Sequence, residues 1–226
     1  MKISQPGDLA PFIQHTLIKV GTTRDEIVRH AEEAVKYGFS AAMVPGSWVP
    51  EVKEVVRGTA VEVASALDFP TVGVTSAWGK AREAESLAKL GADQIDIGVQ
   101  IGWLKSGEYD RFRDDIKGVV EASGVPIKVM LELALLTDKE KEIAVELSLE
   151  AGAAWLKNAS SGAIERANPE SIRYLVERVR DGVKVKASGA ITDFDQAVSL
   201  IEAGAQALGT SAGIELISGG AAVESY

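Results

Sequence analysis

One order of elements recurs four times along the chain and limits the folds that are open to it. In each case an amphipathic helix ends at a glycine and a short apolar run follows, in the segments AVKYGFSAAMV, LAKLGADQIDIGV, LEAGAAWLKN and IEAGAQALGT. The four glycines are Gly38, Gly91, Gly152 and Gly204. Glycine ends helices because it adopts the left-handed conformation without a steric penalty. The pattern therefore predicts repeated helix-to-strand units.

The helix starts and the apolar runs extend this pattern over the whole chain. Thr23 with Glu26 and Thr137 with Glu140 have the spacing of a capping box, and Asn168 precedes Pro169 as a cap precedes a first-turn proline. We expect strands at 13–16, 40–44, 61–67, 94–99, 127–133, 153–156, 183–187 and 207–209. Strands alternating with helices in this way predict an α/β fold, a (β/α)8 TIM barrel forming a single domain over residues 1–226, with 219–226 as a flexible tail.

A doubly wound open sheet is the main structural alternative, because it also alternates strands and helices. Its nucleotide-binding versions carry GxGxxG or GxxxxGK[ST], and the sequence contains neither motif. With 46% hydrophobic residues, the chain has enough apolar content to fill one large core.

Charge and composition narrow the possible partners. The net charge of -9 argues against a nonspecific nucleic-acid partner and against an anionic membrane surface. The sequence has no cysteine, which excludes thiol catalysis and thiolate metal sites. No apolar run approaches the roughly 18 residues of a membrane span, and the start MKISQPGDLAPF lacks the apolar core of a signal peptide. We expect a cytoplasmic protein.

Lysines stand at the ends of two neighbouring predicted strands. Lys157 ends the sixth, in AAWLKNASSG, and Lys186 ends the seventh, in VKVKASGAI, while Asp96 lies in the fourth. The active site of a parallel barrel forms at the carboxyl ends of its strands, so these side chains could share one cavity. Mutual repulsion and desolvation lower the pKa of an amine, which makes a lysine a neutral nucleophile able to form a Schiff base. A solvated or salt-bridged lysine is the alternative interpretation.

Small residues follow both lysines and the eighth strand. Their backbone N–H groups could hold a phosphate at the top of strands seven and eight, as in other barrels, or they could form ordinary turns. The candidates are Gly162, Ser188, Gly189, Gly209, Thr210 and Ser211.

The two histidines predict no metal site. His15 and His30 lack the spacing of metal ligands, and His30 is expected on the exposed face of the helix DEIVRHAEEAVKYG. We expect neither a metal nor an organic cofactor.

At this level of detail the sequence resembles the deoxyribose-phosphate aldolase family, class I aldolases on a (β/α)8 barrel. The matching words extend along nearly the whole chain: HTLIK, DFP, GADQIDIGVQIGWLKSGEY, LLTDKEK, Lys157, VKASGAI and GTSAG. The resemblance implies that Lys157 is the Schiff-base lysine and that Asp96 and Lys186 transfer protons. It also implies that a C-terminal tyrosine, here Tyr226, reaches back into the site, although a tyrosine on a frayed end can stand there by accident.

The sequence departs from the family pattern near the mouth of the barrel. Gln14 replaces an aspartate before HTL, Leu133 replaces a threonine after Glu132, and Ala190 replaces a glycine. KTSTG becomes KNASSG, which places Asn158 and Ala159 beside the lysine, and we include Asn158 among the expected substrate-binding residues. These changes remove polar groups and retain the amines, which favours altered aldehyde selection over loss of amine chemistry.

The resemblance implies reversible cleavage of 2-deoxyribose 5-phosphate to acetaldehyde and glyceraldehyde 3-phosphate, with a small-molecule aldehyde or sugar phosphate as the partner of a homo-oligomeric enzyme. Two alternatives remain open. One is a Schiff-base aldolase for a different aldehyde, with or without a phosphate, and the other is a catalytically silent barrel that binds a sugar phosphate.

Overall fold

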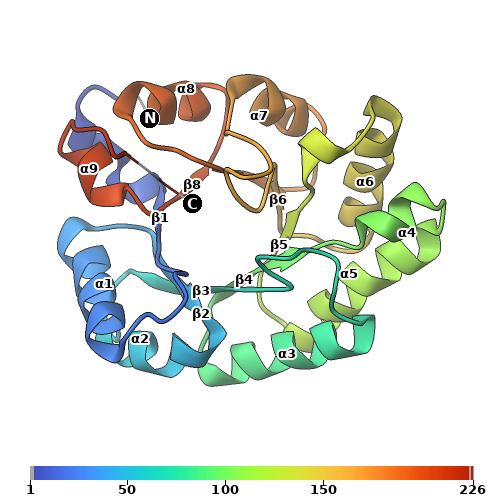
Figure 1. Ribbon diagram of the computed structural model, residues 1–226, viewed down its shortest axis with the longest axis horizontal. Coiled ribbons are helices and arrows are strands. Elements are labelled where there is room, and N and C mark those ends of the chain that lie inside the picture. The colour runs from blue at the N-terminus through green and yellow to red at the C-terminus, as the bar shows by residue number, and fades with distance from the viewer. Residues whose placement is uncertain (1–2, 224, 226) are drawn as a thin grey trace.

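A computed structural model describes residues 3–223 and 225. Eight parallel strands pair in sequence order, and β8 returns to β1, so that the sheet closes into a barrel surrounded by helices (Figure 1). This arrangement confirms the expected (β/α)8 fold and excludes the open doubly wound sheet, which has two edges.

The strands lie close to the expected positions. They are β1 (Ile13–Thr16), β2 (Ala41–Pro45), β3 (Glu62–Leu67), β4 (Gln94–Gly98), β5 (Ile127–Met130), β6 (Trp155–Lys157), β7 (Lys184–Ser188) and β8 (Ala207–Thr210). The largest difference is in β5, which ends three residues early because Glu132 adopts a left-handed φ of 53° and a short 3-10 helix, η3 (Leu133–Leu135), follows. β6 begins two residues later than expected and ends one residue later, at Lys157.

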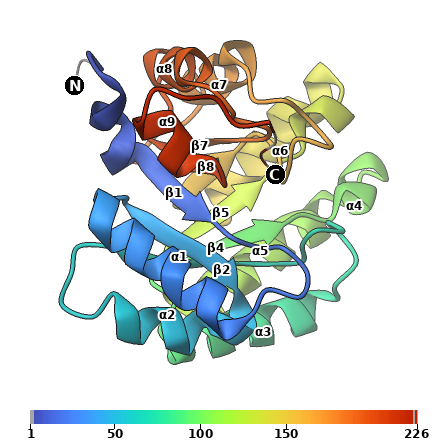
Figure 2. The same ribbon diagram turned by 60° about the vertical axis from the view of Figure 1, so that its left-hand side comes forward.

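Helices and short turns connect the strands on the outside of the barrel (Figures 1 and 2). The helices are α1 (Arg24–Tyr37), α2 (Val49–Val55), α3 (Ala77–Leu90), α4 (Ile101–Lys105), α5 (Tyr109–Ser123), α6 (Asp138–Glu150), α7 (Pro169–Val176), α8 (Phe194–Glu202) and α9 (Gly213–Ile217), with the 3-10 turns η1 (Pro6–Phe12) and η2 (Gly46–Trp48). The expected capping boxes at Thr23 and Thr137 are both present, and the Asn168 side chain accepts from the N–H of Ser171. The three N-terminal helix caps that the sequence motifs predicted are therefore confirmed.

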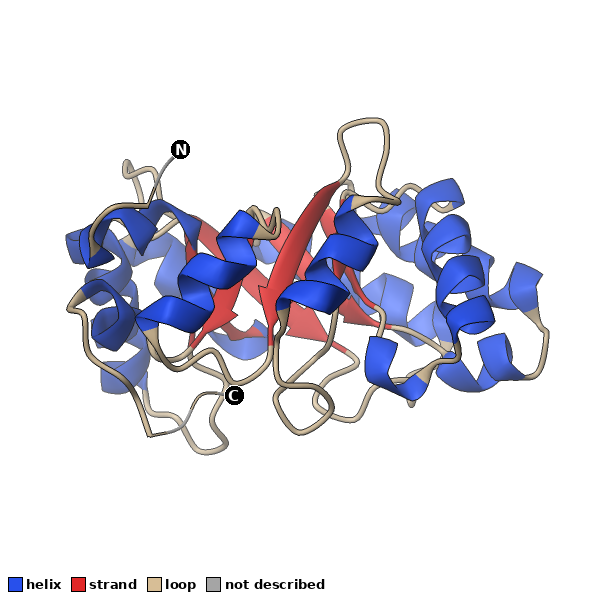
Figure 3. Cartoon of the chain, turned by 90° about the horizontal axis from the view of Figure 1, so that it is seen from above, coloured by secondary structure: helices blue, strands red, loops and turns tan. Residues whose placement is uncertain are grey.

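The apolar core lies between the strands of the barrel and the helices that surround them (Figure 3). Side chains alternate along a strand, so Ile95 and Ile97 of β4 pack into this apolar layer while Asp96 points into the barrel. The barrel interior is unusually polar, because Gln14, Gln94, Asp96, Lys128 and Lys186 are all buried there. None of the described helices is long and apolar enough to cross a membrane.

Candidate active site

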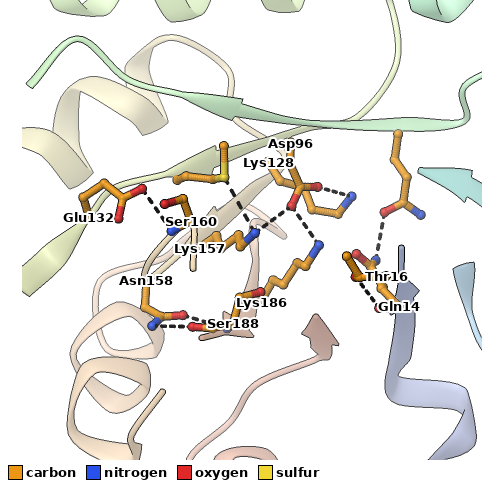
Figure 4. Close-up of polar contacts among 12 residues, drawn as sticks. Gln14, Thr16, Asp96, Lys128, Glu132, Lys157, Asn158, Ser160, Lys186 and Ser188 are labelled. Atoms are coloured by element: carbon orange, nitrogen blue, oxygen red, sulfur yellow. Dashed lines mark hydrogen bonds and ion pairs between the residues drawn. The ribbon is translucent and has the colours of Figure 1, made fainter. Parts of the chain in front are cut away.

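The amines of three lysines surround the buried carboxylate of Asp96 inside the barrel (Figure 4). The Nζ of Lys186 donates to Oδ2 of Asp96 at 2.7 Å, and the Nζ of Lys157 donates to the same oxygen at 3.2 Å. The Nζ of Lys128 lies 3.1 Å from the other oxygen, Oδ1. All four side chains are almost completely buried. The structure thus brings together the three residues that sequence analysis selected, and adds a fourth.

Strand register produces this cluster. Asp96 of β4 is the pairing partner of Lys128 in β5, and Lys157 of β6 is the partner of Lys186 in β7. Residues that pair side by side in parallel strands point to the same face, so each pair presents both side chains to the barrel interior. Lys157 lies two residues after Trp155, nearer the carboxyl end of the barrel, where parallel barrels hold their substrates.

Burial and charge compete strongly at these groups. Burial alone would raise the pKa of Asp96, but the ammonium groups of Lys128, Lys186 and Lys157 together hold it well below its usual range. Burial lowers the pKa of Lys128 to about 7, opposed by the attraction of Asp96 and assisted by repulsion from Lys186 and Lys157. The three lysines thus hold Asp96 in its ionised form, and burial brings the pKa of Lys128 close to neutral pH.

Lys128 is the residue that sequence analysis missed. It stands in the apolar run VPIKVMLE, within a strand whose last inward position is Met130. A lysine flanked by isoleucine and valine inside a predicted strand is a signal of burial, but its partners come from distant parts of the chain. Only the register with β4 shows that Lys128 lies beside Asp96.

A small cavity opens beside Lys157. Its walls combine Lys157, Asp96 and Ser160 with the apolar side chains of Ile18, Met43, Ala66, Phe69 and Met130, and with Thr16. Its volume of about 10 Å³ admits one water molecule. A larger, mainly apolar cleft of about 570 Å³ shares Thr16, Ile18, Ala66 and Phe69 with it and leads outward between the loops after β1, β2 and β3. Lys157 therefore lies at a small cavity that adjoins a cleft large enough for a small molecule.

The loop after Lys157 is fastened by two buried side chains. The Asn158 side chain accepts from the N–H of Ser188 at 2.9 Å and donates to its carbonyl at 3.0 Å, which joins the ends of β6 and β7. Glu132 accepts from the N–H of Ser160 at 3.0 Å, and burial raises the pKa of its carboxyl. Asn158 therefore acts as a structural clamp between the two strands, and its expected contact with substrate stays a prediction.

The candidate phosphate residues gather at the ends of β7 and β8, together with the tail. The N–H of Ser211 donates to Oγ of Ser225 at 3.3 Å, and Oγ1 of Thr210 lies 3.1 Å from the same hydroxyl. Ser225 thus places a hydroxyl oxygen at the Ser211 N–H. The tail reaches this position by pairing Ala221 with Asp193.

An open pocket of about 460 Å³ adjoins this oxygen. Gly162 and Ala190 line it with Arg166, Thr192 and Ser225. The guanidinium of Arg166 donates to Gln196 at 3.1 Å and lies 3.6 Å from Asp193. Arg166 is the one cation among the described residues that line this pocket, and sequence analysis did not select it.

Two glycines are required for the loops to meet here. A Cβ on Gly189 would lie 2.1 Å from the carbonyl oxygen of Glu165, and Gly189 also has a φ of +117°. A Cβ on Gly162 would lie 2.7 Å from that of Ala190. These residues therefore set the shape of the pocket, whatever ligand their backbones bind. Ser188 and Gly209 are paired residues of β7 and β8 beneath it.

Ala190, one of the positions that sequence analysis singled out, has a left-handed φ of +46°. The left-handed conformation costs an L-residue about 1–2 kcal/mol, and glycine loses about 0.5–1 kcal/mol through its more flexible unfolded state. We expect Ala190→Gly to raise the free energy of unfolding by about 0.5–1 kcal/mol, measured by urea denaturation. Ala163→Gly, at a neighbour without positive φ, is the control and is expected to lower it.

The expectation of an exposed His30 was wrong. His30 is buried, stacks on His15 with ring centroids 4.2 Å apart, and its Nε2 lies 3.1 Å from the His15 carbonyl oxygen. Burial lowers the pKa of His15 to about 4 and that of His30 to about 3, so both are neutral. The helix places His30 on its inner face, packed against β1.

These histidines and Glu33 bring three possible metal-ligand atoms within 4.8 Å of one another. Their rings are nearly parallel, at 19°, and the lone pairs of an imidazole lie in its ring plane. Two stacked rings therefore do not aim lone pairs at one ion, and Nε2 of His30 already faces a carbonyl. We interpret this cluster as packing between β1 and α1.

Two other sequence features lie apart from the cavity. Gln14 donates to the side chain of Gln94 at 2.8 Å deeper inside the barrel, and it does not line the cavity beside Lys157. Tyr226 lies outside the described residues, so its expected contact with the site stays a prediction.

The fold and the site together define a class: a TIM-barrel protein with buried amines arranged around a carboxylate, at the end of the barrel where such proteins bind small molecules. No family model matches the chain. It is 41% identical to the deoxyribose-phosphate aldolase of Methanothermobacter thermautotrophicus over 220 residues, which cover 97% of this chain and 98% of that protein. It is 40% identical to the enzyme of the same name from Staphylococcus carnosus, over 94% of this chain and 96% of that one.

A solved structure gives the same result. The tetrameric deoxyribose phosphate aldolase from Aeropyrum pernix superposes with a TM-score of 0.85 at 27% identity, covering 95% of this chain and 91% of that one. The chain belongs to the deoxyribose-phosphate aldolase family. The resemblance identified from sequence words is thereby confirmed.

Proposed function

We propose that this protein is a class I aldolase that reversibly cleaves 2-deoxyribose 5-phosphate to acetaldehyde and glyceraldehyde 3-phosphate. The observation that carries the proposal is Lys157, a buried amine that lines a small cavity and shares Asp96 with two other lysines, in a chain of this family. A silent binding barrel would have no need to bury three amines on one carboxylate, because the desolvation cost is high.

In the proposed reaction Lys157 acts as the nucleophile. Its neutral amine attacks C1 of the open-chain sugar, and the carbinolamine loses water to give an iminium ion. Removal of the C3 hydroxyl proton lets C3 become the aldehyde carbon of glyceraldehyde 3-phosphate, which leaves as the C2–C3 bond breaks. The electron pair of that bond moves toward the iminium nitrogen and gives an enamine. Protonation of the enamine and hydrolysis then release acetaldehyde. The iminium is the electron sink, so the reaction requires no metal and no organic cofactor.

Asp96 and Lys186 are placed to move these protons. Lys186 and Lys157 both donate to Oδ2 of Asp96, so a proton can pass between the two amines through this oxygen. Asp96 in addition balances the positive charge of the iminium nitrogen.

We assign the substrate phosphate to the pocket between the ends of β6, β7 and β8. There a phosphate oxygen would take the place of the Ser225 hydroxyl at the Ser211 N–H, while Arg166 supplies the cation. Gly162, Gly189 and Ala190 keep the backbone close enough to approach such a ligand.

The substrate preference tests this assignment and the proposed reaction together. We expect kcat/KM to be at least about tenfold higher for 2-deoxyribose 5-phosphate than for 2-deoxyribose, because one charge-assisted hydrogen bond contributes about 1.5–3 kcal/mol. Arg166→Gln should remove much of that ratio by raising KM for the phosphorylated sugar alone. The measurement is product analysis by coupled assay, with Arg173→Gln on the exposed face of α7 as control.

Equal efficiencies for both sugars would reject the phosphate site and favour an aldolase of unphosphorylated aldehydes. Cleavage of neither sugar would reject the proposed reaction. An unchanged ratio in Arg166→Gln would remove the arginine from the site and leave the backbone groups.

The remaining expectations are also proposals. The tetrameric structure of the Aeropyrum pernix relative supports a homo-oligomer, which sedimentation can measure. Phosphorylated sugars are retained inside cells, which supports action in the cytoplasm. Truncation before Tyr226 tests whether this residue assists proton transfer.

A further inference from the structure

The Asp96 carboxylate has two oxygens, and the proposed reaction uses only one of them, Oδ2. Oδ2 meets Lys157 and Lys186, whereas Oδ1 meets Lys128 at 3.1 Å. Lys157 and Asp96 line the cavity beside β6, but Lys128 does not. Lys128 therefore has no route to a substrate and can act on the reaction only through its neighbours.

Little in the surroundings of Lys128 screens its charge from the other charged groups of the cluster. Lys128 is completely buried. Its Nζ lies 5.9 Å from the ring centroid of Trp155, the first residue of β6. The charged groups facing it are Asp96 from β4, Lys157 from β6 and Lys186 from β7. With little water to screen them, charges at these separations interact far more strongly than at the surface.

The charge count then limits how many of the lysines can be protonated. Within this group of four, three ammonium groups and one carboxylate would leave two net positive charges in a buried volume, which is costly, and the Glu132 carboxyl attracts Lys157 as well. Each proton on Lys128 makes a proton on Lys157 less favourable, and a neutral Lys157 is the form that attacks a carbonyl.

We propose that Lys128 is a positioning residue that acts by its charge: it opposes protonation of Lys157 and holds the Asp96 carboxylate with Oδ2 turned toward the two reacting amines. This inference rests on the proposed function in taking Lys157 as the nucleophile. It assigns the third lysine of the barrel a purpose that neither binding nor proton transfer requires.

The test is the pH profile of Lys128→Met. Loss of the cation should let Lys157 hold its proton to higher pH, so the acidic limb of kcat/KM should move upward by about one pH unit. Activity at pH 7 should fall about tenfold and recover as the pH rises, with KM nearly unchanged. Lys184→Met is the matched control, because this exposed lysine also lies over Trp155, at 5.1 Å from its ring centroid, and should leave the limb in place.

A second variant separates charge from orientation. Lys128→Gln keeps a polar side chain beside Asp96 but carries no charge, so the proposal expects the same upward shift as in Lys128→Met. A shift in the methionine variant alone would show that orientation is what matters, and would overturn the role of charge. A loss of activity that is equal at every pH in both variants would show a merely structural role, and would also overturn it.

A readout independent of turnover keeps this test separate from the proposed function. The pH dependence of acetylation of Lys157 by acetic anhydride, followed by peptide mass, reports its protonation in folded variants, checked by circular dichroism. If wild-type protein cleaves no sugar, the proposed function fails, and labelling still tests Lys128. If labelling of Lys157 has the same pH midpoint in wild type and in both variants, the inference about Lys128 fails even where cleavage is active.

Discussion

Lys157→Ala is expected to lower kcat/KM for 2-deoxyribose 5-phosphate by at least about 10⁴-fold, as removal of a covalent nucleophile does. The reason is geometric as well as chemical. Lys157 is the one lysine that lines the cavity beside β6 among the described residues, so the other two amines of the cluster cannot replace it. In wild-type protein, acetaldehyde with borohydride should leave an ethyl group on Lys157, because hydride reduces the imine to a stable secondary amine.

Peptide mapping by mass spectrometry measures this adduct. Lys184→Ala serves as control, since this lysine is exposed and lies on the neighbouring strand, and it should retain both turnover and the adduct at Lys157. Two results would contradict the assignment of Lys157 as the nucleophile. One is ethylation of surface lysines alone in the wild type, and the other is an undiminished total yield of ethylated protein in Lys157→Ala.

The fold could be predicted because its signals are local. A capping box such as Thr23 with Glu26 and a terminal glycine such as Gly38 act within a few residues, and each is found as expected. Alternation of helix and strand then leaves few topologies for a chain of this length. The end of β5 was missed for a local reason as well, since the apolar residues after Met130 continue through a left-handed turn at Glu132.

The site was predicted only in part because its contacts are long-range. Lys157 is the last residue of β6, a position that in a barrel already indicates the site, whereas Lys186 lies in the middle of β7 and not at its end as expected. Lys128 stands inside its strand, and its neighbour Asp96 is apparent only from the pairing of β4 with β5. His30 was misplaced because a polar residue on an amphipathic helix resembles a surface residue until a second histidine stacks on it.

The candidate phosphate pocket illustrates the same limit. Gly162 and Ser211 could be selected as small residues in turns, but Arg166 and Ser225 carry no comparable pattern. They reach the pocket because the loop after β6 and the tail fold onto the ends of β7 and β8. Asn158 is a further example, since its hydrogen bonds to Ser188 of the neighbouring strand are not indicated by its place beside the nucleophile.

Lys186→Met is expected to lower kcat by about 10²–10⁴-fold, the range for loss of a general acid–base group, with a smaller change in KM. Its ammonium makes the shortest contact with Asp96 in the cluster, 2.7 Å, and shares Oδ2 with Lys157. Removing it breaks the proton path between the two amines. It also removes a cation next to Lys157, so the acidic limb of the pH–rate profile should move to higher pH.

The plateau of that profile separates the two effects. If Lys186 acted by its charge alone, raising the pH would restore the rate, as we expect for Lys128→Met. Because Lys186 also transfers a proton, kcat for Lys186→Met should stay low even where Lys157 is fully neutral, while Lys184→Met, two residues earlier in β7, follows the wild type. An unchanged kcat with an unchanged acidic limb would remove Lys186 from the mechanism. Recovery to the wild-type plateau at high pH would reduce its role to electrostatics and leave Asp96 as the group that carries the proton.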